Sequence, residues 1–173
     1  AVGCSGPTYP KERLAESLQQ VLAGEQLKTV VRFLDHTLAV QLEYPNVLAQ
    51  HDGEIAIGPA FSEAARKVLQ AVHRVLLSTD AEVHFYVLLL SDPQTPGAYL
   101  TMVRYLDDVR RAEVSMLNTE EMLERTVFDL NFVGDKALTL EQYVPRGIQM
   151  EEFLSWQLAR RLQHQLMETL QLS

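Results

Sequence analysis

Cysteine is almost absent from this chain of 173 residues, and the only one is Cys4. A single thiol cannot form a disulfide within the chain, and it is too few for a structural zinc site built on thiolates. Long apolar runs are missing as well: the longest, Phe85 to Leu90, is far shorter than the ~20 residues that a membrane-spanning helix needs. We therefore expect an ordinary hydrophobic core to stabilise the chain, and its length suffices for one.

Positive charge is also scarce. The chain has 15 Lys and Arg against 23 Asp and Glu, so its formal net charge is -8. A surface of that sign repels phosphate groups, and the basic residues do not cluster beyond short pairs such as Arg110-Arg111, so we expect no nucleic-acid partner. Hydrophobic residues at 47% and charged residues at 22% are ordinary values for a globular domain and argue against a disordered chain.

The motifs of common catalytic and nucleotide-binding sites are missing too. There is no Gly-x-Gly-x-x-Gly loop for a nucleotide and no Gly-x-Ser-x-Gly turn for a nucleophilic serine. The histidines are scattered, and no two of them have the His-x-x-x-His spacing of metal ligands. We therefore predict no catalytic residues, no metal site and no cofactor. One alternative stays open: an enzyme, for instance a hydrolase, whose dispersed acids and histidines converge in the fold, among them His84, Asp92 and Asp107.

A helix followed by a strand forms the centre of the expected fold. From Phe61 to Leu76 the apolar residues recur in steps of three and four, which places them on one face of a helix that starts at Gly58-Pro59. The next segment, 83–90, is apolar at nearly every position and rich in residues that favour strands, which predicts a strand covered on both faces. A helix packed on a central strand is typical of a two-layer domain.

An antiparallel hairpin is expected before this centre. Segments 28–34 and 37–44 alternate apolar and polar residues and are joined by Asp35-His36, a plausible tight turn. These two residues could be taken for a catalytic pair, but neighbours at a hairpin tip usually point apart into water, so we expect no such role.

A strand is expected after the centre, over 99–105, antiparallel to 83–90 and followed by a helical turn at 106–113. A helix over 96–111 also fits the spacing of the apolar residues. Weaker patterns complete the chain: a helix from Pro10 to Gly24, a loop at 46–53, a short strand at 54–57, a helix from a capping box at Asn118 and Glu121 to Gly134, and an extended piece at 137–140. Together they predict a single two-layer α+β domain over residues 10–173, after a tether at residues 1–9, with a mixed or antiparallel sheet of about four to five strands packed with helices.

The longest helical pattern is at the C-terminus, over 150–172. Its leucines recur every four residues, at Leu154, Leu158, Leu162, Leu166 and Leu170. The simpler interpretation is a long terminal helix docked on the domain. The alternative is that part of it, notably Phe153 and Trp156, binds a protein partner.

The first residues, Ala1-Val2-Gly3-Cys4, resemble the lipobox of bacterial lipoproteins, in which small residues precede a cysteine that becomes acylated. Val2 and Gly3 match that pattern, whereas Ala1 stands where the family usually has leucine. The resemblance implies lipidation of Cys4, an anchor in a membrane surface and a domain that stays in water. Because Ser5 does not resemble an inner-membrane retention signal, it also implies the periplasmic side of the bacterial envelope, at the outer rather than the inner membrane.

These observations predict a membrane-tethered envelope lipoprotein that acts as a non-catalytic binding or assembly module. Its expected partners are the membrane surface, through the lipid on Cys4, and a protein of the envelope. A soluble subunit without a lipid is a further alternative, beside the enzyme described above.

Overall fold

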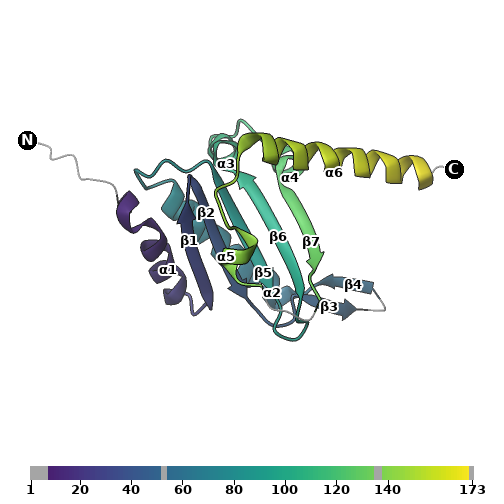
Figure 1. Cartoon of the computed structure of the whole chain (residues 1–173), viewed down its shortest axis with the longest axis horizontal. Helices are drawn as coiled ribbons and strands as arrows, with labels where there is room; N and C mark the ends of the chain where they lie inside the picture. Colours follow the sequence, from purple (N-terminus) through teal and green to yellow (C-terminus); the bar gives the residue numbers. More distant parts are fainter. Residues whose placement is uncertain (1–7, 52–53, 135–137, 172–173) are drawn as a thin grey trace, which may run out of the picture.

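The computed structural model describes residues 8–51, 54–134 and 138–171, which form one α+β domain around a five-stranded sheet (Figure 1). The strands lie in the order β1-β2-β5-β6-β7. Their bounds are Thr29–Leu34 for β1, Thr37–Glu43 for β2, Phe85–Ser91 for β5, Ala98–Tyr105 for β6 and Val127–Phe132 for β7. Strands β2 and β5 are parallel and all other neighbours are antiparallel, so the sheet is mixed. The predicted fold class is confirmed.

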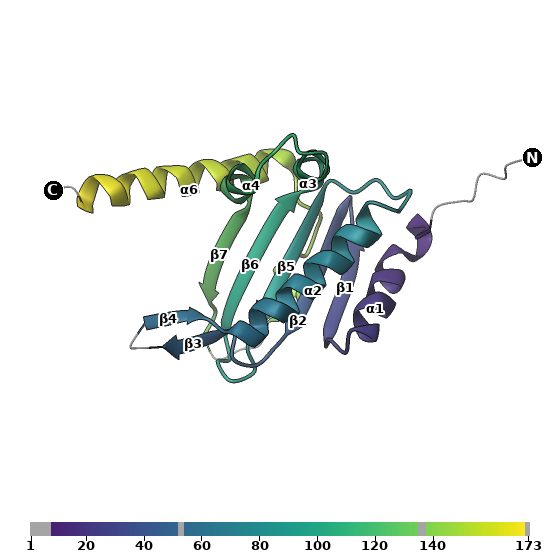
Figure 2. The ribbon, with the colours of Figure 1, turned by 180° about the vertical axis from the view of Figure 1, so that it is seen from behind.

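One face of the sheet is covered by α1 (Leu14–Gly24) and α2 (Pro59–Leu76), which lie in front of it in Figure 2. Helix α2 begins after Gly58 with Pro59 in its first turn, as the sequence predicts. It lies within the connection from β2 to β5, because two parallel strands need a crossover between them. The buried residues of α2 recur on one helical face: Phe61, Ala64, Val68, Ala71, Val72, Val75 and Leu76.

The opposite face is only partly covered, by α5 (Leu140–Tyr143) and the first turns of α6 (Met150–Gln171). Strand β5 therefore lies between two apolar clusters. Tyr86, Leu88 and Leu90 belong to the cluster under α1 and α2, whereas Phe85, Val87 and Leu89 belong to the cluster under α5 and α6. The prediction of a strand covered on both faces is confirmed.

The helix expected from residue 118 to Gly134 is shorter than predicted. Its start is as expected, since Asn118 and Glu121 form both hydrogen bonds of a capping box, but α4 ends at Arg125 (Thr119–Arg125). The next residues form β7, which pairs with β6. Pairing with the sheet edge gives these backbone groups hydrogen-bond partners, and this tertiary contact overrides the helical pattern.

In the remaining segments the structure differs from the prediction at one further place, the loop expected at 46–53. Residues 98–105 form β6, antiparallel to β5, and α3 (Leu106–Glu113) follows, which confirms the strand over the helical alternative. Part of the loop expected at 46–53 is instead strand β3 (Leu48–His51), which pairs with β4 (Glu54–Ile57) in a separate hairpin. Backbone pairing with the expected strand at 54–57 explains the difference. A short 3-10 turn, η1 (Lys11–Arg13), precedes α1. Of the extended piece expected at 137–140, residue 137 lies outside the described residues and Leu140 begins α5.

Helix α6 docks only through its first turns and then extends past β7 (Figure 1). Phe153 is buried, whereas the five leucines spaced four residues apart are 51–69% exposed. We call these five the leucine stripe: Leu154, Leu158, Leu162, Leu166 and Leu170. None of the helices in the described ranges is both long and apolar enough to cross a membrane.

Candidate functional site

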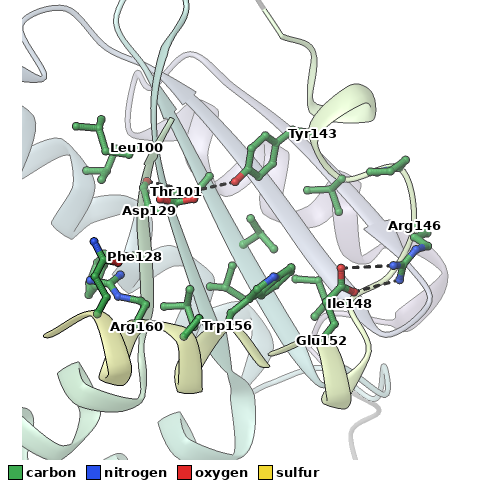
Figure 3. Close-up of a pocket in the computed structure, with 18 of the residues that line it drawn as sticks. Leu100, Thr101, Phe128, Asp129, Tyr143, Arg146, Ile148, Glu152, Trp156 and Arg160 are labelled. Carbon is green, nitrogen blue, oxygen red and sulfur yellow. Dashed lines mark hydrogen bonds and ion pairs between the residues drawn. The ribbon is translucent and has the colours of Figure 1, made fainter. Parts of the chain in front are cut away.

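A groove of about 1050 Å³ lies on the partly covered face of the sheet (Figure 3). Strands β6 and β7 line its floor, α6 lines one wall, and the segment from α5 to Ile148 lines the other. Helix α5 has 4 residues and so is roughly 6 Å long, whereas the 6 residues of β7 span roughly 20 Å. A helix that short cannot cover the strands, and the uncovered part of the face becomes the groove.

Part of the groove lining is apolar. It includes side chains from the sheet, from the segment after α5 and from α6: Val87, Val103, Val127, Val144, Ile148 and Trp156. Apolar clefts with a few convergent polar groups are the usual form of binding sites in proteins.

Three residues form a hydrogen-bonded chain on one side of the groove. The Tyr143 hydroxyl donates to Thr101 Oγ1 at 3.0 Å, and Thr101 Oγ1 donates to the backbone carbonyl of Asp129 at 3.1 Å (Figure 3). Burial raises the pKa of Tyr143 above its ordinary value of 10.0. Tyr143 therefore stays a neutral phenol at physiological pH, and its hydrogen bond fastens α5 to the sheet.

The rim of the groove carries charges of both signs. Arg146 Nη1 lies 3.1 Å from Glu152 Oε2 and so joins the segment after α5 to α6. Farther along α6, the guanidinium carbon of Arg160 lies 5.9 Å from the centre of the Phe128 ring. An exposed ion pair contributes only about 0–1 kcal/mol to stability, so Arg146 and Glu152 can reorient around a ligand at little cost in free energy.

Ionisable side chains also line the groove, among them Asp129, Glu152 and His164. Glu152 is paired with Arg146, and His164 Nδ1 lies 3.5 Å from Glu168 Oε1 on the same helix. The groove therefore offers a ligand both apolar surface and charged groups.

The two residues expected to bind a partner occupy different environments. Phe153 is 2% exposed and its ring lies 5.1 Å from that of Phe85, so it belongs to the core. Trp156 is half-buried and lines the groove, where a partner can reach it. Cys4, the expected lipidation site, lies outside the described residues.

The three residues of the enzyme alternative are not brought together. His84 precedes β5 and Asp92 follows it, which separates them by roughly 26 Å of extended chain. Asp92 is buried and accepts a hydrogen bond from the backbone N–H of Val47 at 3.0 Å, so it fastens a loop. Asp107 forms an ion pair at 2.9 Å with Arg111 on its own helix.

Most of the groove and one pair of histidines could not be predicted from the sequence. A capping box of Thr139 and Gln142 marks the start of α5 and could have shown that helix, but not its place against β6. His36 and His84 are far apart in the chain, yet their ring centroids are 4.8 Å apart. No spacing rule within one helix or strand could have paired them.

Comparison with known proteins adds no relative. No protein-family model matches the chain, and no curated protein or solved structure matches it. The functional interpretation therefore depends on the geometry of the groove, on α6 and on the N-terminal sequence.

Proposed function

We propose that this chain is a lipoprotein of the bacterial envelope, anchored through Cys4, whose folded domain is a non-catalytic binding module for a protein partner. The observation that carries the binding role is the groove beside α6, which has both apolar and polar lining, together with the leucine stripe exposed on the same helix. Exposed apolar surface of this extent is typical of interaction sites. The resemblance of Ala1-Val2-Gly3-Cys4 to a lipobox supports the anchor, and Ser5, which does not resemble an inner-membrane retention signal, supports the outer-membrane address.

The partner segment that fits best is an amphipathic helix. Leucines spaced four residues apart form a ridge that packs into the groove of another helix, and beyond β7 this ridge faces solvent. Full burial of a leucine contributes ~1.5–3 kcal/mol, so covering three half-exposed leucines contributes on the order of 3 kcal/mol. That free energy corresponds to roughly a hundredfold in affinity.

The anchor would also orient the domain. The chain is first fastened to the domain near Tyr9, whose N–H donates to the Ser78 carbonyl at 3.3 Å. From Cys4 to Tyr9 an extended chain reaches at most roughly 17 Å, so α1 would lie close to the membrane. Helix α1 and the C-terminal end of α6 lie at opposite ends of the molecule (Figures 1 and 2), so the C-terminal end of α6 would lie far from the lipid.

Site-specific photo-crosslinking tests the binding role. A photo-reactive phenylalanine at Leu158, 60% exposed on α6, should give a discrete crosslinked product in intact cells. The matched control is Val30, which is 48% exposed on β1 at the far edge of the sheet and should give none. Leu166→Glu should weaken the Leu158 product at least about tenfold, because binding would bury a charge. Equal products from Leu158 and Val30, or none from Leu158, would count against this surface.

The anchor has a separate test. Wild-type protein expressed with its native leader should incorporate labelled palmitate and sediment with membranes, and Cys4→Ser should lose both properties. Membrane association that survives Cys4→Ser, or wild-type protein that takes up no label, would rule out the lipid while leaving the crosslinking result intact.

A further inference from the structure

The parallel pairing of β2 and β5 brings two histidines side by side. Thr37 at the start of β2 lies opposite Phe85 at the start of β5, and the residues just before them are His36 and His84. The carbonyl of His36 accepts hydrogen bonds from the backbone N–H groups of His84 at 2.8 Å and Phe85 at 3.2 Å. The imidazole rings stack with 17° between their planes. The sheet itself therefore holds the two histidines together.

Glu82 joins this pair. Glu82 and His84 are exposed, whereas Val83 between them is buried, so the two side chains face solvent on the same side of the chain. Glu82 Oε1 is 3.2 Å from His84 Nε2, and one donor atom from each of the three side chains lies within 4.8 Å of the other two.

The Nδ1 atom of His36 is the ring nitrogen that faces Glu82. It lies 2.9 Å from the backbone carbonyl of Glu82 and 3.9 Å from Glu82 Oε2. Because a carbonyl can only accept, Nδ1 carries the proton when no metal is bound. A metal ion bound at Nδ1 would displace that proton, and Nε2 would then carry the ring N–H.

We propose that His36, Glu82 and His84 bind a divalent transition-metal ion of the zinc class. Two imidazoles and one carboxylate suit Zn²⁺ and its neighbours, whereas Ca²⁺ and Mg²⁺ favour sets of oxygen ligands. Tetrahedral ligands at ~2.0–2.2 Å from zinc lie roughly 3.3–3.6 Å from one another, close to the separation of Glu82 and His84. The side chains are 47–72% exposed, so small rotations close the remaining gaps and an ion can enter from solvent. Three protein ligands leave a fourth position for water or another group. The site stands independently of the lipid anchor and the groove.

Calorimetric titration of the untagged chain with zinc chloride tests the site. We expect saturable binding of one ion per chain, unaffected by an excess of magnesium chloride. His84→Asn and Glu82→Gln should each weaken binding at least about tenfold, because each removes a ligand. His36→Asn should do the same while keeping the turn, because asparagine tolerates the left-handed backbone at this position, where φ is 65°.

The matched control is His164→Asn on α6. His164 is also exposed and lies 3.5 Å from Glu168, but the two form only a pair. Its zinc affinity should equal that of the wild-type chain. The proposal fails if no saturable binding occurs below about millimolar zinc, if His84→Asn binds like wild type, if His164→Asn weakens binding equally, or if magnesium displaces the zinc. Because the three ligands are exposed, circular dichroism should show every variant folded.

Discussion

Replacing Phe153 by alanine tests how α6 is fastened to the domain. The Phe153 ring is 2% exposed and lies against the Phe85 ring at 5.1 Å between centroids, with 52° between the planes. After this residue the helix has few buried side chains and leaves the body of the protein. Phe153 is therefore the main apolar contact between α6 and the sheet, and its loss should leave a cavity at that contact.

The expected loss can be worked out from this burial. Truncation of a buried phenylalanine to alanine costs about 3–5 kcal/mol, of which the tilted ring pair accounts for about 0.5–1.5 kcal/mol. A domain of this kind is stable by roughly 5–15 kcal/mol, so Phe153→Ala should stay folded with a clearly reduced free energy of unfolding. Phe153→Leu keeps most of the volume and should cost less than about 1.5 kcal/mol.

Urea unfolding followed by circular dichroism measures this loss. With a slope of roughly 2 kcal/mol per molar urea, the midpoint of Phe153→Ala should fall by about 2 M. Leu154→Ala is the matched control, since Leu154 is the next residue on the same helix but is 53% exposed. Its free energy of unfolding should change by no more than about 0.5 kcal/mol. A loss below about 1 kcal/mol in Phe153→Ala, or equal losses in both variants, would refute the assignment of Phe153 to the core.

Two further predictions concern a loop glycine and the apolar cluster under α1 and α2. Gly97 has φ 82°, and a Cβ there would lie 1.6 Å from the Gly134 carbonyl oxygen, so Gly97→Ala should lower the melting temperature by several degrees in a thermal scan. Burial and the nearby Arg104 lower the pKa of His73, which is hydrogen-bonded to the Tyr86 hydroxyl at 2.8 Å, below its ordinary 6.5. The unfolded chain then binds the proton more readily, so this contribution to stability is complete above pH 6.5 and falls as the pH drops towards the folded pKa. Urea unfolding at about pH 7.5 and 5.5 should show a smaller decrease in His73→Gln than in wild type, and identical decreases would contradict the reasoning.

Much of the fold can be read from local patterns. The helix at 61–76 and the strand at 83–90 were predictable because their apolar residues repeat with the period of the element itself. The hairpin turn was predictable in the same way, and Asp35 and His36 both have the positive φ values that a tight turn of this kind requires. In each case the deciding contacts lie within a few residues of one another.

The candidate site was only partly predictable. Trp156 belongs to the helical pattern at the C-terminus, and the structure places it in the lining of the groove. The stripe at 154–170 was equally visible, but its exposure was not, because the sequence does not show where the sheet ends. The other wall of the groove depends on how Tyr143 reaches Thr101 across 42 residues of chain.

The sequence by itself determined the helix at 61–76, the strand at 83–90 and the turn at Asp35-His36, because those features depend on side chains only a few positions apart. Only the tertiary structure decided that residues 127–132 pair with β6. It also decided that His36, Glu82 and His84 meet beside the N-terminal ends of β2 and β5. The pairing of β2 with β5 follows from the crossover through α2, and its register sets the two histidines in line. Side chains that meet through strand pairing have no fixed spacing in the chain, so no local sequence pattern can predict which of them meet.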